Sequence, residues 1–320
     1  MARRVLITGG TGFVGRYLCE FYQSQDWEVH SVARHKAPIS PHAHAHSVDL
    51  TNGRDVERLI MEVKPEIVQH LAAQSSVEES RRDPYGTWLT NVSGQFHVLE
   101  AVRRHAQKAT VVVVGSSDEY GNVSPDDNPV TEAHPLLPVN PYALSKVAQD
   151  LMGYQYAANF DMRVVRVRPF LQIGPRRSAQ FVMGSFARQV VRIADHQQEP
   201  RIEVGNIDLM RDFTDVRDVA RALALVASEG EPAAVYNIAS GEGHSLREML
   251  HEMLRQTGIE AEIHALPELL RHGEMPLLVG DAALLRGRTS WRPQISLEQS
   301  IADTLEDWGR VERGEAVTTS

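Results

Sequence analysis

Two side chains four residues apart have the types and spacing that proton transfer needs. Tyr142 and Lys146 lie in the stretch 141–159, whose periodicity predicts a helix, so both are expected on one helix face. An ammonium group beside a phenol favours the phenolate, and lowering a tyrosine pKa from ~10 to ~7 requires roughly 4 kcal/mol. The hydroxyl of Ser116, at an expected strand end, would polarise a carbonyl or an alcohol beside that phenol. These residues predict proton exchange with a ligand oxygen.

A glycine-rich turn near the start of the chain predicts a dinucleotide site. The strand expected at 4–8 runs directly into Gly9, Gly12 and Gly15, with Thr11, Phe13 and Val14 between them, and then into helical periodicity. In this order the first glycine allows a tight turn, the second lets the backbone approach a pyrophosphate, and the third lets the helix pack on the strand. The N-terminus of the helix then faces the phosphates.

The end of the next strand predicts which dinucleotide is bound. An acid at this position binds the ribose 2′-hydroxyl, whereas an arginine accommodates a 2′-phosphate. Arg34 stands here and the acid is missing, which favours NADP and leaves NAD as the alternative. Asp49, after the third strand, is a candidate adenine contact and equally an ordinary loop carboxylate. Backbone close to the cofactor is also expected at further strand ends, namely at Leu50, Leu71, Ala72 and Ala73.

The elements that position these residues alternate between short β-branched runs and amphipathic stretches. We expect strands at 4–8, 28–33, 45–48, 67–71, 111–115 and 163–167, with helices at 12–25, 54–63, 84–105 and 141–159. This alternation predicts an α/β fold with a Rossmann-type, doubly wound parallel sheet. After Pro169 the rhythm changes: strands at 202–204 and 235–239 alternate with helices at 179–195, 216–228 and 245–256. We therefore predict a cofactor-binding domain of residues 1–170 with parts of 212–240, and a smaller ligand-binding α/β lobe of 171–211 and 241–320.

Composition narrows the class of partner. The 320 residues are 42% hydrophobic and 23% charged, which is ordinary for a globular protein, and no apolar run approaches the ~20 residues that span a membrane. A net charge of -9 disfavours attraction to nucleic-acid phosphates. The single cysteine, Cys19, fits a reducing compartment, and the glycine turn follows too closely on Met1 for a secretory segment. The expectation is a cytoplasmic enzyme without a nucleic-acid or membrane partner.

In these motifs the sequence resembles the extended short-chain dehydrogenase/reductase family, in its nucleotide-sugar-modifying branch, over nearly the whole chain. The resemblance implies that Ser116, Tyr142 and Lys146 are catalytic, and that Tyr142 and Lys146 also contact the cofactor at its nicotinamide ribose. Counting four residues back from the tyrosine in Gly115–Gly121 favours Ser116, with adjacent Ser117 as the alternative. Asp118 stands where the 4,6-dehydratases of the family carry an acid, although related reductases can have one there too.

The resemblance also implies a set of substrate contacts. The positions of Arg211 and Arg271 grip the substrate diphosphate in such enzymes, a task suited to the bidentate guanidinium group. Arg177 and Glu274 complete the expected substrate contacts. One position departs from the family, because Leu171 replaces the usual asparagine and removes a polar anchor.

Within this branch, segments 115–121, 211–218, 274–281 and 291–297 together most resemble the GDP-4-keto-6-deoxy-D-mannose reductases, followed closely by the GDP-mannose 4,6-dehydratases. This implies NADP-dependent reduction of the C4 keto group of a GDP-linked 4-keto-6-deoxyhexose, giving GDP-D-rhamnose. A 4,6-dehydratase or an epimerase is the alternative. A cofactor-binding sensor without activity is a different class; Leu171 favours it and the Tyr142–Lys146 pair argues against it. Relatives commonly form homodimers through the helices expected at 84–105 and 141–159.

Alternating histidines occur at His42, His44 and His46. This alternation aligns three imidazoles on one face of a strand. No carboxylate or cysteine completes a ligand set, and the setting is a loop of the variable kind. The sequence therefore predicts no metal site.

Overall fold

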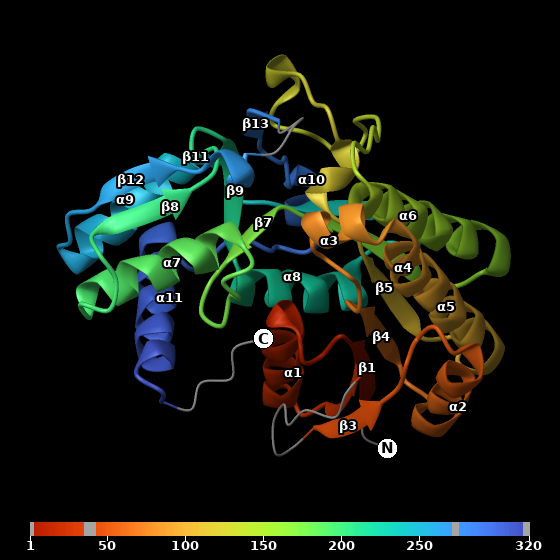
Figure 1. Ribbon diagram of the computed structural model, residues 1–320. Coiled ribbons are helices and arrows are strands. Elements are labelled where there is room, and N and C mark those ends of the chain that lie inside the picture. Colours follow the sequence, from red (N-terminus) through yellow and green to blue (C-terminus); the bar gives the residue numbers. More distant parts are fainter. Residues whose placement is uncertain (1–2, 35–42, 271–274, 316–320) are drawn as a thin grey trace.

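The computed structural model describes residues 3–34, 43–270 and 275–315, and its centre is a sheet of seven parallel strands (Figure 1). The strands follow the order β10-β6-β5-β4-β1-β2-β3. Their bounds are β1 Arg4–Thr8, β2 Glu28–Ala33, β3 His44–Ser47, β4 Ile67–His70, β5 Thr110–Val114, β6 Val164–Pro169 and β10 Val235–Ile238. Because β1 lies between β2 and β4, the direction of winding reverses there, and the crevice at the carboxyl ends of these strands is where such sheets bind ligands.

Helices cover both faces of this sheet. One layer contains α1 and α8, and the other contains α2 and α5 beside α6. The bounds are α1 Phe13–Ser24, α2 Gly53–Val63, α3 Val77–Arg82, α4 Pro84–Trp88, α5 Gly94–His105, α6 Pro141–Phe160, α8 Val216–Glu229 and α10 Ala283–Arg288. Four single turns complete the connections: a π turn at Leu89–Ser93 and 3₁₀ turns at Ser117–Tyr120, Pro125–Asp127 and Pro267–Leu269.

The single helix expected at 84–105 is divided into two α-helices by one turn of π-helix. The π turn Leu89–Ser93 separates α4 from α5, and Asn91 in that turn is buried. Its amide accepts from the backbone N–H of Gln74 at 2.7 Å and donates to the Ser145 hydroxyl at 2.9 Å. These bonds tie the π turn to α6 and to the loop after β4, which gives a physical reason for a local departure from the α-helix.

A smaller group of elements packs over the carboxyl ends of the strands. It contains a four-stranded sheet of β7 Leu171–Ile173, β9 Met210–Asp215, β11 Gly243–Ser245 and β13 Leu277–Leu278, and a pair formed by β8 Arg201–Val204 and β12 Glu262–Ala265. Its helices are α7 Val182–Ala194, α9 Leu246–Thr257 and α11 Leu297–Glu312. These elements share a separate apolar core that includes Phe186, Met249 and Trp308. The predicted fold class, a doubly wound sheet with a smaller C-terminal lobe, is confirmed.

Part of the region expected in the second lobe packs elsewhere. Leu278, Ala282, Leu285 and Trp291 belong to the core beneath the seven-stranded sheet. The indole N–H of Trp291 donates to the carbonyl of Asp218 in α8 at 2.9 Å.

Among the helices of the described ranges, none is both long and apolar enough to cross a membrane.

Candidate active site

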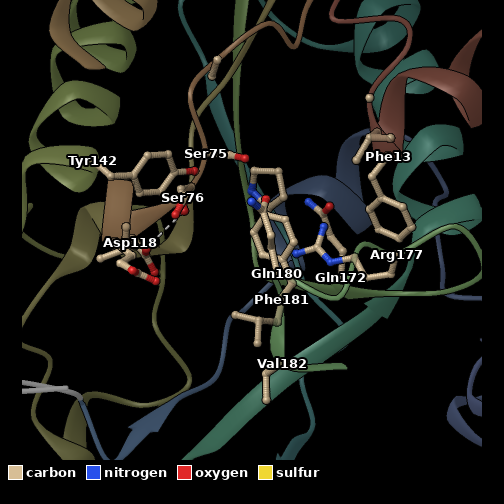
Figure 2. A pocket seen from close by; sticks show the side chains of 18 of the residues that line it. Phe13, Ser75, Ser76, Asp118, Tyr142, Gln172, Arg177, Gln180, Phe181 and Val182 are labelled. Atoms are coloured by element: carbon tan, nitrogen blue, oxygen red, sulfur yellow. Dashed lines mark hydrogen bonds between the residues drawn. The ribbon is translucent and has the colours of Figure 1, made fainter. Parts of the chain in front are cut away.

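A cavity of about 900 Å³ opens at the carboxyl ends of the central strands, with walls from both lobes (Figure 2). This volume is within the range of small-ligand and cofactor sites. All the described residues that the sequence marked as site residues line it: Gly9, Thr11, Gly12, Phe13, Val14, Gly15, Arg34, Asp49, Leu50, Leu71, Ala72, Ala73, Ser116, Ser117, Asp118, Tyr142, Lys146, Arg177 and Arg211. Arg271 and Glu274 lie outside the described residues.

The glycine turn forms a backbone cradle at the floor of this cavity. Gly9 has φ +71°, and a Cβ there would lie 2.9 Å from the backbone nitrogen of Ala72. A Cβ on Gly15 would lie 2.2 Å from the carbonyl oxygen of Gly9, so only glycine allows α1 to start this close to β1. Gly12 is the N-cap of α1, whose first backbone N–H groups are the donors that a diphosphate requires. The cradle therefore fits the pyrophosphate of a dinucleotide.

Two charged residues lie at the rim of the same cavity. Arg34 directly follows β2 and is exposed, as a contact to a ribose phosphate requires. Asp49 accepts from the backbone N–H and the hydroxyl of Thr51 at 2.9 and 2.8 Å. These bonds, with a smaller contribution from the Arg34 charge, lower the pKa of Asp49. The Asp49 carboxylate is thus ionised and oriented at the end of the cavity where Arg34 lies.

Tyr142, Ser116 and Asp118 come together at the other side of the cavity. Tyr142 is in the first turn of α6, capped by Asn140, whose side chain accepts from the backbone N–H of Ala143 at 2.8 Å. Both neighbours act on the phenol of Tyr142: hydrogen bonding by the Ser116 side chain lowers its pKa, and the Asp118 charge raises it. Figure 2 shows Tyr142 and Asp118 on one side of the pocket, with Phe13 and Arg177 on the other.

The charge state of Tyr142 differs from the expectation drawn from its spacing to Lys146. Burial, followed by the Asp118 charge, raises the pKa of Tyr142 above its usual value, against the opposing hydrogen bond from Ser116. The Lys146 ammonium lies 5.9 Å from the centre of the Tyr142 ring and donates to the carbonyl of Val114 at 2.8 Å. Burial lowers the pKa of Lys146 to about 8. The prediction of a lowered tyrosine pKa is therefore wrong, and the phenol holds its proton at neutral pH.

Beneath these groups lies a buried ionic network that the sequence analysis missed. Glu119 is fully buried; one carboxylate oxygen accepts from the backbone N–H of Ser116 at 2.8 Å and the other from Arg168 at 3.2 Å. Arg168 also donates to Asp150 at 3.0 Å, and Asp150 in turn pairs with Arg166. Burial and the nearby Asp150 raise the pKa of Glu119, while the Arg168 charge opposes that shift. The sequence did carry a signal for this network: Glu119 is an acidic residue directly before Tyr120, at a position that should face the core.

Arg177 is held by two aromatic rings at the opposite wall. Its guanidinium lies 4.7 Å from the ring centre of Phe13 and 3.8 Å from that of Phe181. Burial lowers the pKa of Arg177 to about 10, and its buried Nε has no hydrogen-bond partner among the described residues. Arg211 lies in β9 and donates to the carbonyl of Met210 at 2.7 Å. Arg177 and Arg211 thus supply cationic groups from the second lobe to the cavity.

Leu171, which departs from the family, is the first residue of β7. Leu171 packs against the core of the smaller lobe while also reaching the cavity. Gln172 is the next residue, and its side chain is seen in the pocket beside Arg177 (Figure 2). A polar amide is therefore present one position after the missing asparagine.

Comparison with known proteins identifies the family. The family model described as GDP-mannose 4,6 dehydratase matches residues 6–304. The chain belongs to this family. The resemblance to the nucleotide-sugar branch of the extended short-chain dehydrogenases/reductases is therefore confirmed.

The chain is similar to two curated relatives and to one solved structure over nearly its whole length. GDP-6-deoxy-D-mannose reductase from Pseudomonas aeruginosa is 35% identical over 96% of this chain and 98% of its own. GDP-mannose 4,6 dehydratase from Drosophila melanogaster is 28% identical over 94% of this chain and 85% of its own. The structure of RMD from Pseudomonas aeruginosa complexed with NADPH has a TM-score of 0.87 and 34% identity, covering 97% of this chain and all of the other.

Proposed function

We propose that this family member is an NADP-dependent reductase that converts the C4 keto group of GDP-4-keto-6-deoxy-D-mannose to the alcohol of GDP-D-rhamnose. The observation that carries the proposal is that Tyr142, Ser116 and Lys146 line one cavity together with the glycine cradle, and burial there raises the pKa of Tyr142. A ketone reduction requires a proton donor at the carbonyl oxygen, and a raised tyrosine pKa keeps that proton in place at neutral pH. The 35% identity to a GDP-6-deoxy-D-mannose reductase supports the same substrate class.

The proposed reaction has two halves. When bound, NADPH supplies the hydride that is added to C4 of the sugar. Tyr142 donates its proton to the carbonyl oxygen, so one C–H bond and one O–H bond form as the C=O double bond becomes single. Ser116 orients that oxygen, and Tyr142 then regains a proton from solvent. Lys146 lies between Val114 and the tyrosine ring, where its charge favours transient phenolate and its ammonium can bind the cofactor ribose.

Contacts to the sugar nucleotide are proposed at the wall opposite Tyr142. Arg177 and Arg211 would bind the diphosphate, because both are cationic and line the cavity. Gln172 would replace the polar anchor that Leu171 removes. Arg271 and Glu274 remain predicted contacts from the sequence.

A 4,6-dehydratase is the second candidate, and one observation favours it. Asp118 lies close enough to Tyr142 for its charge to raise the phenol pKa, so an acid for water elimination stands beside the reacting centre. Both candidates exchange a hydride with the same cofactor, but a reductase consumes NADPH, whereas a 4,6-dehydratase takes hydride from C4, returns it to C6 and so regenerates NADP in each turnover.

Cofactor stoichiometry tests the proposal. With GDP-4-keto-6-deoxymannose we expect one NADPH to be consumed per sugar reduced, measured as loss of nicotinamide absorbance. With GDP-mannose alone we expect no 4-keto product, because GDP-mannose has no keto group for a reductase to reduce. A dehydratase would form that product without net use of cofactor, since it returns the hydride to C6 within each turnover. Dehydration of GDP-mannose with catalytic NADP and no net absorbance change would overturn the reductase and make Asp118 the candidate acid.

A preference for the phosphorylated dinucleotide is expected from Arg34. NADP(H) should bind at least ~10-fold tighter than NAD(H), equivalent to about 1.4 kcal/mol, because a guanidinium pairs with the 2′-phosphate. Arg34→Ala should reduce this ratio while leaving the affinity for NAD(H) nearly unchanged. Fluorescence titration of both cofactors with both proteins measures this, and equal affinities in the unmodified protein contradict it.

We propose that two copies of the chain pair through α4, α5 and α6. Apolar side chains on these helices are unusually exposed: Tyr85 72%, Trp88 43%, Phe96 46%, Leu144 50%, Leu151 53% and Tyr154 51%. Such a patch is a common mark of a protein interface. Light scattering should give the mass of two chains, and Leu151→Lys should give one. Leu284→Lys is the matched control because Leu284 is similarly exposed, at 55%, on α10.

A further inference from the structure

A cluster of three histidines and one carboxylate lies on β2 and β3, away from the cavity. β3 is the edge strand of the seven-stranded sheet, and its parallel register sets His30 beside His44 (Figure 1). Because side chains alternate along strands, Glu28, His30, His44 and His46 all project from one face. The carboxylate that the sequence around His42–His46 lacks is therefore supplied by the neighbouring strand.

The distances in this cluster suit a small cation. The Glu28 Oε1 atom lies 3.1 Å from His30 Nε2 and 3.7 Å from His44 Nε2. Ligand atoms of Glu28, His30 and His44 all lie within 4.8 Å of one another. A tetrahedral zinc ion with ligands at about 2.0–2.1 Å separates neighbouring ligand atoms by about 3.3 Å, and the separations of 3.1 and 3.7 Å lie on either side of that value.

The second ring nitrogen of His30 already has a partner. His30 Nδ1 lies 3.0 Å from His46 Nε2. A metal-binding histidine almost always uses its other nitrogen in this way, because the bond fixes the tautomer and the direction of the ring.

The third proposed ligand, His44, has room to rotate its ring into a position that binds the metal. The His44 ring stacks on that of His30, with centres 4.8 Å apart and planes inclined by 19°. One ion cannot lie in the planes of two stacked rings, so the His44 ring must turn toward Glu28. Its side chain is 60% exposed, which leaves room for that rotation.

We propose that Glu28, His30 and His44 bind a zinc ion, with His46 holding the His30 ring and water completing the coordination. The ion would replace the hydrogen atom between His30 Nε2 and Glu28, and would connect edge strand β3 to β2. The site is structural and lies outside the cavity of the proposed reductase. The zinc proposal therefore does not depend on the proposed reductase activity.

Zinc binding to the full-length chain tests this proposal. Titration with Zn²⁺ at pH 7.5 should show one site with a Kd of about 10 µM or tighter, and the midpoint of thermal unfolding should rise as zinc is added. Co²⁺ should give the intense visible absorption of a four-coordinate nitrogen and oxygen site. His44→Ala should weaken zinc binding at least ~10-fold and remove that absorption, while turnover stays unchanged because His44 is outside the cavity.

Two controls separate this site from others. His251→Ala removes an exposed histidine of α9 and should leave zinc affinity unchanged. His42→Ala removes the neighbouring histidine of the alternating run and should also have little effect. The assignment would be overturned if the unmodified protein showed no saturable zinc binding. It would also be overturned if zinc binding survived His44→Ala, or if only His42→Ala abolished it. Glu28→Gln, which keeps the shape of that side chain, should weaken binding in the same way as His44→Ala.

Discussion

Replacing Tyr142 with phenylalanine is expected to reduce turnover by ~1000-fold, within the range of 10²–10⁴ that a positioned general acid typically contributes. The change removes only the oxygen that is hydrogen-bonded to Ser116 and carries the proton. The glycine cradle and Arg34 are untouched, so the affinity for NADPH should change by less than about threefold. Steady-state rates and a cofactor titration on the same preparation measure both quantities.

Tyr154→Phe is the matched control for this experiment. Tyr154 lies on the same helix, α6, but its ring is 51% exposed and contacts Arg166. It should retain nearly full turnover. If Tyr142→Phe keeps more than about a tenth of the activity, the phenol is not the proton donor and another acid in the cavity must be sought.

The second large effect is expected at Glu119, which acts through Lys146 and Ser116 and is therefore a positioning residue. Burial lowers the pKa of Lys146 and the Glu119 charge opposes that shift, so that the pKa lies at about 8. In Glu119→Gln the lysine should lose its proton at a lower pH. Because the ammonium is proposed to bind the cofactor ribose, kcat/KM for NADPH should fall as pH rises through about 8 in the unmodified protein, and at lower pH in the variant.

Stability should decrease together with this pH shift. Glu119 and Arg168 form a buried ion pair at 3.2 Å, with side chains 0% and 4% exposed. Removing one charge from such a pair costs about 3–5 kcal/mol, and the amide of glutamine should recover part of that loss. Urea unfolding measures the loss. Glu242→Gln, at a carboxylate that is 81% exposed, should change neither stability nor the pH profile. An unchanged pH profile in Glu119→Gln would show that the network only supports the fold.

Much of the fold follows from local sequence patterns. The strands at Arg4–Thr8 and Glu28–Ala33 have the bounds that their β-branched runs predicted, and α6 extends one residue beyond its predicted end. The short strands β7, β9, β11 and β13 had no such signal. Each contains six residues or fewer, and they are stabilised by pairing with segments distant in the chain. Neither propensity nor periodicity reports such pairing.

The same distinction applies to the candidate site. The sequence by itself determined the glycine cradle, the Tyr142–Lys146 pair and Arg34, because each depends on one local element: a strand–turn–helix unit, one helix face and one strand end. Only the tertiary structure decided the rest. Glu119 meets Arg168 across 49 residues, and Arg177 lies between Phe13 and Phe181. The pKa of Tyr142 is raised because burial, a property of the whole fold, and the Asp118 and Glu119 charges outweigh the Ser116 hydrogen bond and the Arg177 charge. In the same way, the register of β2 and β3 brings Glu28 and His30 to His44.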